Sequence, residues 1–222
     1  MKTSVCCCAV WLGIAVLARA QLAAPPPEAA TEPFSLGAFI SYWNLSRLDG
    51  LDFGSAGGGG IVGHFRLRGP FACELRLSGF AARESRDIVT ETGEEIDNDV
   101  TIVSMPLEAG VRVYLPLGEK LSFYAGPGGG FYLFDGQSNN HRDGKKTVYD
   151  IEVDDNFGAY ALAGLRAQLF PRLAVFAEAR YAWIETSVEK ATDVRTDIGI
   201  DWVAQELDFS GFAANAGLLF TF

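Results

Sequence analysis

The chain has 222 residues, of which 49% are hydrophobic and 21% charged, and its formal net charge is −10. This length suits one domain with small appendages. The excess of acidic residues argues against nucleic acid as a partner, because phosphate binding needs a basic face. Beyond the first 20 residues no run of 18 apolar residues occurs, which excludes a transmembrane helix. A membrane-spanning β-barrel is not excluded, because its apolar residues occupy alternate positions.

The first 20 residues have the organisation of a secretory signal peptide. Lys2 supplies the positive start, Val5 to Leu17 forms an apolar core too short to span a bilayer, and Ala18-Arg19-Ala20 offers a cleavage site. Removal of Lys2 and Arg19 would leave 18 − 2 = 16 basic against 28 acidic residues, a mature charge of 16 − 28 = −12. The protein is therefore expected to leave the cytoplasm.

Two further features follow from this cleavage. Cys6, Cys7 and Cys8 lie inside the signal, so Cys73 would remain as a lone thiol and no internal disulfide would hold the fold. Residues 21–33 contain a Pro/Ala-rich stretch that is expected to be a linker without packed structure.

From Phe34 onward the pattern is strand, gap, strand. About eight strands are predicted, each long enough for the roughly 9–11 residues that a tilted strand needs to cross a bilayer. Their expected ranges are 34–44, 57–68, 71–84, 99–115, 121–134, 156–169, 173–186 and 209–222.

The connections between these strands alternate in length. The second, fourth and sixth strands are followed by tight turns, whereas longer polar loops are expected near 45–56, 85–98, 135–155 and 187–208. Short turns on one rim and long loops on the other are typical of outer-membrane barrels. A soluble up-and-down barrel has no physical reason to sort its loops in this way.

The last stretch shows the alternation most clearly. Phe212, Ala214, Ala216, Leu218, Phe220 and Phe222 share one face, and small or polar residues share the other, with Leu219 as the exception. A strand with an aromatic at its end suits the closure of a barrel at a membrane interface.

The polar faces of the other strands carry Glu and Arg. The candidate interior ion-pair network consists of Glu74, Arg76, Glu108, Arg112, Arg166, Glu178 and Arg180. Apart from Lys2 in the signal, every lysine lies in a predicted turn or loop. Arginine is the cation suited to fixed pairing with carboxylates, so the polar face is expected to point into the barrel. Glu-x-Arg spacing suggests pairs Glu74/Arg76 and Glu178/Arg180, with Glu108/Arg112 more loosely spaced.

Eight strands leave an interior just wide enough for side chains to fill, so this network is expected to plug the lumen. The glycines at 57–60 and 126–130 would give room for large neighbours and for curvature. Pro106 and Pro127 sit within predicted strands, where they lack an N–H for the sheet. Either one shared bulge is expected there, or one of the two strands is shorter than predicted.

Aromatic residues are expected at the two rims, as membrane-interface girdles predict, although strand propensity accounts for any single one nearly as well. The candidates are Tyr42, Trp43, Phe71, Tyr114, Phe123, Phe134, Phe170, Tyr181, Trp183, Phe209 and Phe222.

Together, the signal peptide, the alternation, the loop asymmetry and the terminal Phe222 resemble the small eight-stranded outer-membrane barrel families, namely the OmpA-type transmembrane barrel and its OmpX- and OmpW-like relatives. The resemblance covers 34–222. It implies an all-β, eight-stranded antiparallel up-and-down transmembrane barrel with short periplasmic turns and long extracellular loops, in a Gram-negative outer membrane. It also implies contact with the lipid bilayer and lipopolysaccharide. In these families the barrel assembly machinery reads the C-terminal strand. That role would fall on Phe212, Leu218, Phe220 and Phe222.

No catalytic, cofactor or metal site is predicted. An esterase would need a His–Ser pair with an orienting group. His64 has no serine two residues away on its face, and His141 lies in a polar loop. The acidic stretches 84–99 and 150–155 could hold divalent cations, but their spacing matches no calcium loop, and the usual behaviour of charge runs favours a solvated loop.

Three functions remain open. The first is a monomeric, non-enzymatic surface barrel with a plugged lumen and a structural or interaction role. The second is a narrow pore or a path for small hydrophobic molecules, as in OmpW-like proteins. The third is a secreted, soluble lipocalin-like binder, which would turn the polar faces outward.

Overall fold

The computed structural model describes residues 34–45, 55–89, 95–142, 145–151, 153–188 and 205–222. No helix in these segments is long and apolar enough to cross a bilayer. The strands are β1 (Phe34–Leu45), β2 (Ala56–Arg66), β3 (Phe71–Val89), β4 (Glu95–Pro116), β5 (Leu121–Arg142), β6 (Lys145–Ile151), β7 (Asn156–Phe170), β8 (Leu173–Trp183), β9 (Glu185–Val188), β10 (Gln205–Asp208) and β11 (Gly211–Thr221). The predicted signal peptide and linker lie outside the described residues.

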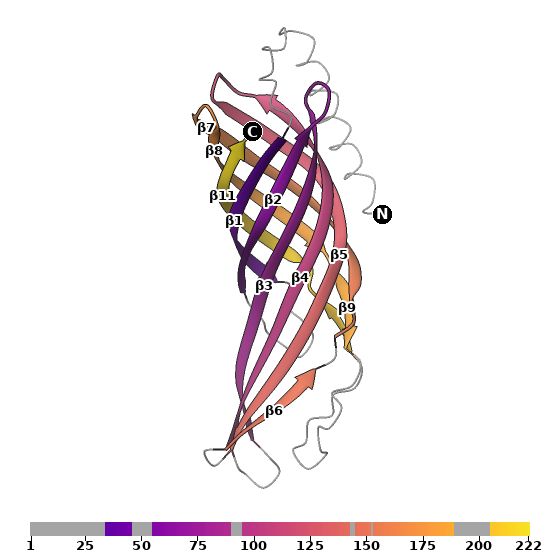
Figure 1. Cartoon of the computed structure of the whole chain (residues 1–222). Helices are drawn as coiled ribbons and strands as arrows, with labels where there is room; N and C mark the ends of the chain where they lie inside the picture. The colour runs from indigo at the N-terminus through magenta and orange to yellow at the C-terminus, as the bar shows by residue number, and fades with distance from the viewer. Residues whose placement is uncertain (1–33, 46–54, 90–94, 143–144, 152, 189–204) are drawn as a thin grey trace, which may run out of the picture. The chain divides into compact units, whose positions relative to one another are not determined.

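Eight of the described strands close into a barrel: β1, β2, β3, β4, β5, β7, β8 and β11. Each pairs antiparallel with its neighbours, and the first and last strands, β1 and β11, pair with each other from Ser35↔Thr221 to Leu45↔Gly211 (Figure 1). Closure leaves no free edge within the barrel, so the backbone donors and acceptors are satisfied without water. The predicted all-β, eight-stranded antiparallel up-and-down barrel is confirmed.

The two faces of the sheet are also as predicted. Leu75 and Leu107 are 53% and 60% exposed on the outer surface, whereas Arg76, Arg112 and Arg180 are at most 2% exposed and point inward. An inside-out arrangement would set these arginines in hydrocarbon, at about 2–4 kcal/mol each near the bilayer midplane. In a membrane the sheet is therefore stable only with its apolar face outward and its charged face inward.

The barrel ends differ in the way the loop lengths predicted. At one end the strands are joined by short turns, and in the first of these Gly69 has φ of +73°, a left-handed conformation that glycine adopts without a Cβ clash. The N–H of Leu67 donates to the Phe71 carbonyl across this turn at 2.9 Å. The first and last barrel residues, Phe34 and Phe222, lie at this same end, where the Phe222 N–H donates to the Phe34 carbonyl at 3.1 Å.

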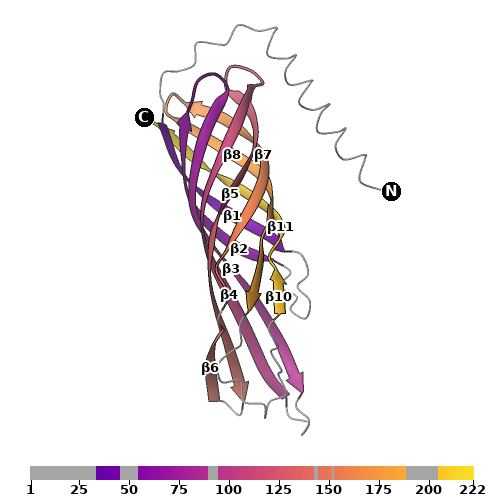
Figure 2. The same cartoon turned by 90° about the vertical axis from the view of Figure 1, so that its right-hand side faces the viewer.

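At the other end three strands run far beyond the barrel. Pairing of β2 with β3 stops at Ala56↔Ala82, and pairing of β5 with β7 stops at Tyr132↔Asn156. Past these points β3, β4 and β5 continue as a sheet that β6 extends (Figure 1 and Figure 2). Much of the stretches 85–98 and 135–155, expected to be loop, is therefore strand. The sequences of these stretches lack the clear period-two alternation of the barrel strands, which is why they were expected to be loop.

The expected bulge at the two prolines is wrong. Pro106 pairs with Tyr132, and the β4–β5 ladder resumes at Val113↔Ala125 in the same register after a gap beyond Gly110↔Gly128. On the other side of Pro106 the β3–β4 ladder is interrupted between Leu77↔Leu107 and Phe80↔Ser104. Each proline thus lies at a gap in one ladder, and the register is the same on both sides of each gap. A register shift occurs elsewhere, between Gln168 and Phe170 at the start of the β7–β8 turn.

Candidate functional site: the charged lumen

The barrel lumen holds the acidic and basic side chains of three strands. β3 contributes Glu74 and Arg76, β4 contributes Glu108 and Arg112, and β8 contributes Glu178 and Arg180. Each of these six residues is at most 5% exposed. They occupy every second or fourth position of their strands, so the pleat points all of them to the same side of the wall.

Glu178 lies at the centre of the network. Its carboxylate accepts hydrogen bonds from Arg76 Nη2 at 2.6 Å, Arg112 Nη2 at 3.1 Å, Tyr124 Oη at 2.9 Å and Asn215 Nδ2 at 2.8 Å. These donors come from β3, β4, β5 and β11, so one carboxylate joins opposite parts of the barrel wall. Such charge-assisted bonds compensate a carboxylate for its lost hydration.

Glu74 forms the second centre. It pairs with Arg76 at 3.3 Å and with Arg112, and it accepts a hydrogen bond from Tyr160 Oη at 3.2 Å. His64 Nε2 lies 3.0 Å from its other oxygen, and the Tyr114 hydroxyl lies 3.5 Å from His64 Nδ1. Two arginines therefore bridge Glu74 and Glu178 into one cluster.

A separate pair lies between β4 and β8. Arg180 Nη1 donates to Glu108 Oε2 at 2.7 Å, its Nη2 contacts the other oxygen of the same carboxylate, and Nη2 also lies 2.7 Å from the Tyr132 hydroxyl. The guanidinium stands over the rings of Tyr160 and Trp43, at 4.2 and 5.0 Å from their centroids. This two-point pairing with aromatic stacking is the geometry for which arginine is suited and lysine is not.

Arg166 lies apart from the carboxylates. Its Nη2 is 3.3 Å from both the Thr221 hydroxyl and the Gln168 side-chain oxygen, and Thr221 in turn contacts the Ser35 hydroxyl at 3.0 Å. This polar group sits at the short-turn end of the lumen. Of the seven residues expected to form the network, the structure brings six into carboxylate–arginine contacts and places Arg166 in this neighbouring cluster.

The expected pairing between residues two positions apart is only partly right. Glu74 does contact Arg76, but Arg180 pairs with Glu108 rather than Glu178, and Arg112 pairs with Glu74 and Glu178 rather than Glu108. Residues i and i+2 lie about 7 Å apart along a strand, whereas barrel closure brings side chains of distant strands to hydrogen-bonding distance across the lumen. Residue spacing along the chain therefore does not predict these pairs, because they depend on how the barrel closes.

Glycines of the wall make room for the tyrosines of the network. A Cβ on Gly128 would lie 2.2 Å from Tyr160 Cζ, and one on Gly164 would lie 2.6 Å from Tyr124 Cζ. The ring of each tyrosine covers a glycine of the adjacent strand, which places its hydroxyl at a carboxylate. Close approach of a large neighbour thus explains Gly128 in the 126–130 stretch, whereas a Cβ on Gly126 or Gly130 would first meet a carbonyl oxygen of β4.

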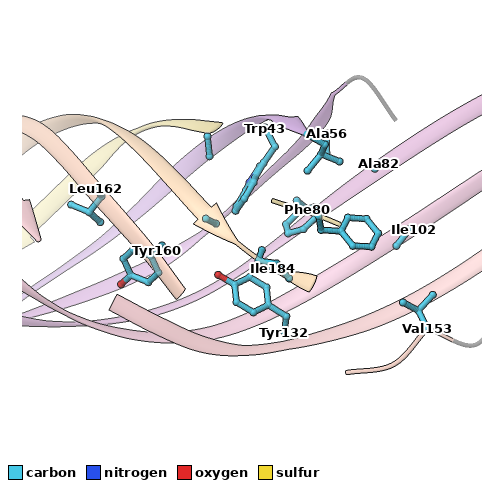
Figure 3. Close-up of a cluster of buried hydrophobic side chains, with 14 of the residues drawn as sticks. Trp43, Ala56, Phe80, Ala82, Ile102, Tyr132, Val153, Tyr160, Leu162 and Ile184 are labelled. Atoms are coloured by element: carbon cyan, nitrogen blue, oxygen red, sulfur yellow. The ribbon is translucent and has the colours of Figure 1, made fainter. Parts of the chain in front are cut away.

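The loop end of the lumen is apolar. Phe80, Ile102, Ile184 and Phe209 are each at most 3% exposed and belong to a cluster that continues down to Tyr132 and Trp43. Figure 3 shows Trp43, Phe80 and Tyr132, from three different strands, and Ile184, between β8 and β9, converging on the barrel interior. The charged network therefore has an apolar layer above it on the side of the long hairpins.

The predicted aromatic girdle is only partly right. Tyr42, Phe71, Phe170, Trp183 and Phe222 do lie on the outer surface. Trp43, Tyr114 and Phe209 are buried in the lumen, and Phe134 packs against the same interior cluster. Aromatic content alone does not separate the two faces, because rings serve both a membrane interface and a barrel interior.

Leu219, the exception in the last strand, is also explained. It is fully buried and packs inside the barrel with Phe39, Val62, Ala174 and Phe176. The lumen is therefore not uniformly polar, and an apolar residue on the inward face of β11 completes this second interior cluster.

Several members of the network were not singled out from the sequence. His64, Tyr160 and Asn215 stood on polar faces without an assigned role, and Tyr124 and Tyr132 gave no signal beyond their alternate spacing. The tyrosines share one signal: each has an inward position against a glycine of the neighbouring strand. This signal can be recognised only when the strand register is known.

The C-terminal strand presents its four candidate assembly residues to the outside. Phe212, Leu218, Phe220 and Phe222 are 64%, 53%, 42% and 58% exposed. Phe220 and Phe222 form an edge-to-face pair with centroids 5.1 Å apart, close to Phe34 of β1. Their role in assembly remains a prediction.

Within the described residues no group of three or more His, Cys, Asp or Glu side chains is arranged to hold a metal ion. Asp99, for which a cation role was considered, receives hydrogen bonds from Arg83 Nη2 at 2.8 Å and from the Ser85 hydroxyl. His141, in the long hairpin, lies where side chains are outside the description.

A closed antiparallel barrel with an apolar outer band, a charged lumen and hairpins of unequal length defines an integral outer-membrane barrel. Residues 12–220 match the family model described as the outer membrane protein beta-barrel domain, and the chain belongs to that family. It is accordingly a protein of the outer membrane. No curated protein sequence matches it.

Two solved structures are similar in fold. OprG from Pseudomonas aeruginosa has a TM-score of 0.59 and 15% identity, with 86% of this chain and 96% of that chain covered. The outer membrane protein W of E. coli, solved in solution by NMR, has a TM-score of 0.51 and 15% identity, with 87% and 100% covered. The soluble lipocalin-like alternative is excluded, because the charged faces point inward and the chain belongs to an outer-membrane family.

Proposed function

We propose that this protein is a non-enzymatic outer-membrane barrel with a structural or surface-interaction role, whose lumen is closed by the Glu/Arg network. The observation that carries the proposal is the central carboxylate. Glu178 is bound from four strands at the middle of an eight-stranded barrel, whose interior is only wide enough for side chains.

The histidine of the lumen supports the absence of turnover. His64 has Glu74 at one ring nitrogen and the Tyr114 hydroxyl near the other. It is thus held by an acid and a phenol, and a nucleophilic mechanism would need a serine or another activated nucleophile at one of these positions.

The proposal includes three partners. The outer band contacts the first two, the lipid bilayer and lipopolysaccharide. The third, the barrel assembly machinery, recognises the outward aromatic residues at the C-terminal strand. The barrel itself works as a monomer. The extended sheet of β3 to β6 would be the part that meets other molecules at the cell surface, because it projects beyond the barrel at the end opposite the short turns (Figure 2).

Planar-bilayer recording tests the closed lumen. The folded wild-type protein is expected to give no steady single-channel current, and Glu74→Gln with Arg76→Gln is expected to produce current because the central contacts are lost. Steady current from the wild type contradicts the plug. If neither the wild type nor the variant gives a current, the ion-pair network is not the only barrier to ions in the lumen.

One observation favours a second candidate, a path for small hydrophobic molecules. The loop end of the lumen is packed with apolar side chains, among them Phe80, Ile102 and Ile184, each at most 3% exposed. If these side chains part, they present an apolar surface to a solute that enters from outside. Uptake of a hydrophobic dye by vesicles that contain the barrel, faster than by empty vesicles and slowed by Ala82→Trp in this layer, would favour transport over the structural role.

A further inference from the structure

The outer wall of the barrel is hollowed on one side. An open trough of roughly 700 Å³ crosses β7, β8, β11 and β1, with Phe123 of β5 at one end. It lies on the face opposite the interior clusters just described, and most of its lining is apolar. A groove of this size falls in the range of ligand sites.

The strand register explains the shape of the trough. Gly164, Glu178, Asn215 and Ser41 are direct neighbours on four adjacent strands, and the last three belong to the inward-facing set. Their backbone therefore forms the floor when the wall is viewed from outside. Inside the barrel, the same row holds the central carboxylate, so the trough lies directly behind the ion-pair network.

Small side chains form the walls. One side consists of Ala163, Ala179 and Ala214, which are direct neighbours across the strands. The other side consists of Leu165, Ala177 and Ala216. Because the two rows are two residues apart on each strand, they lie about 7 Å from each other. One hydrocarbon chain fits between them and can contact both rows at about 4 Å.

The remainder of the outer surface differs in this respect. The outer face of β2, β3 and β4 carries large aliphatic side chains that are at least half exposed: Ile61, Leu75, Leu77, Met105 and Leu107. Outward alanines thus adjoin one another across the strands at the trough, whereas on β3 and β4 Ala81 and Ala109 stand among larger side chains.

The length and direction of the trough indicate which molecule fills it. From β5 to β1 it covers four strand spacings, or about 19 Å. One leaflet of a hydrocarbon core of about 30 Å is about 15 Å thick, so an acyl chain that starts at one end of the trough fills most of its length. The trough continues the surface that faces lipid in an outer-membrane barrel, which makes lipid the available occupant.

The two ends of the trough distinguish the leaflets. Phe123 lies two residues after the start of β5, near the short turns, whereas Tyr42 lies three residues before the end of β1, near the long hairpins. Tyr42 is 59% exposed and offers a hydroxyl at the loop end. Tyrosine favours the boundary between hydrocarbon and polar headgroups. We propose that the trough holds one acyl chain of an outer-leaflet lipid, with the polar part of that lipid at Tyr42.

A second copy of the chain fits less well. In a two-fold dimer the same patch would face itself, so two troughs would enclose a void. Association within a bilayer relies on close packing and has no hydrophobic drive of its own. A narrow chain fills the trough without that void.

Native mass spectrometry of the full chain, released from outer membranes in mild detergent, tests the proposal. Wild-type protein is expected to retain an outer-leaflet lipid, recognised by its mass. Ala179→Leu with Ala214→Leu fills the trough and is expected to reduce retention about tenfold. The matched control, Ala81→Leu with Ala109→Leu, enlarges outward alanines on β3 and β4 and should retain as much lipid as the wild type.

Folding of each variant is checked by the faster gel mobility of the unboiled protein. Equal retention by the trough variant and the control would overturn the proposal. Retention of phospholipid alone, or of a dimer that the trough variant dissolves, would overturn it as well. Tyr42→Phe should weaken retention, and unchanged retention would contradict the assigned direction of the lipid.

Discussion

At the scale of single residues, the barrel depends on how its buried charges are compensated. Glu178 has four donors on four strands, so its loss affects more than one pair. Without the carboxylate, Arg76 and Arg112 would share Glu74 alone in an interior that excludes water. A buried charge that has lost its partner is strongly destabilising, whereas an exposed pair contributes little.

Glu178→Gln is expected to lower the free energy of unfolding by about 3–5 kcal/mol, because two arginines lose a shared counter-charge. Urea unfolding of the detergent-folded protein measures this difference. The control is Arg83→Gln, which breaks the surface pair with Asp99, where the arginine side chain is 66% exposed. Its expected effect is below about 1 kcal/mol. Equal effects of the two substitutions would show that the network does not stabilise the barrel.

At the scale of strands, close packing of wall and lumen is the limiting factor. The ring of Tyr160 lies on Gly128, and its hydroxyl reaches Glu74. Gly128→Ala would push the ring away from the wall and lengthen that hydrogen bond. Gly57 offers a matched control on β2, since nothing lies within 4 Å of a Cβ added there.

Gly128→Ala is expected to destabilise the folded barrel by about 1–3 kcal/mol, the range for overpacking. Gly57→Ala should be neutral or slightly stabilising, because it reduces the freedom of the unfolded chain by up to about 1 kcal/mol. Midpoints of urea unfolding for the two variants provide the comparison. If the Gly128→Ala protein is as stable as the Gly57→Ala protein, the strands and the Tyr160 ring adjust to the added methyl group without loss of stability.

Strand alternation predicted most of the fold, and it did so for a physical reason. The period of two places Glu74, Arg112 and Glu178 on one face, and the absence of lysine from the barrel strands indicated that this face is the inside. Lys145 and Lys146, expected in a loop, lie in β6 beyond the barrel. Alternation does not carry the identity of partners across the lumen, so the Arg180–Glu108 pair was missed. The aromatic-girdle expectation placed Phe209 at a rim, although alternation sets it on the face opposite Phe212, because aromatic rings suit both a membrane interface and a barrel interior.

At the scale of the whole molecule, the hairpin asymmetry determines orientation. The short turns and the chain ends of the barrel lie together, and the extended sheet of β3 to β6 projects at the other end. Long polar hairpins belong outside the cell, because short turns face the periplasm in barrels of this kind. The charged residues of each rim should therefore be reached from opposite sides of the membrane.

Cysteine labelling in intact cells can establish this orientation. In a Cys73→Ser background, Ser85→Cys on the projecting part of β3 is expected to react with a membrane-impermeant maleimide added outside. Lys120→Cys, in the turn between β4 and β5, should react only after the outer membrane is permeabilised. Both positions are solvent-exposed, so a difference in labelling reports the side of the membrane rather than burial. Labelling of Lys120→Cys alone in intact cells would place the short turns outside and reverse the assignment of every loop, including the end of the trough marked by Tyr42.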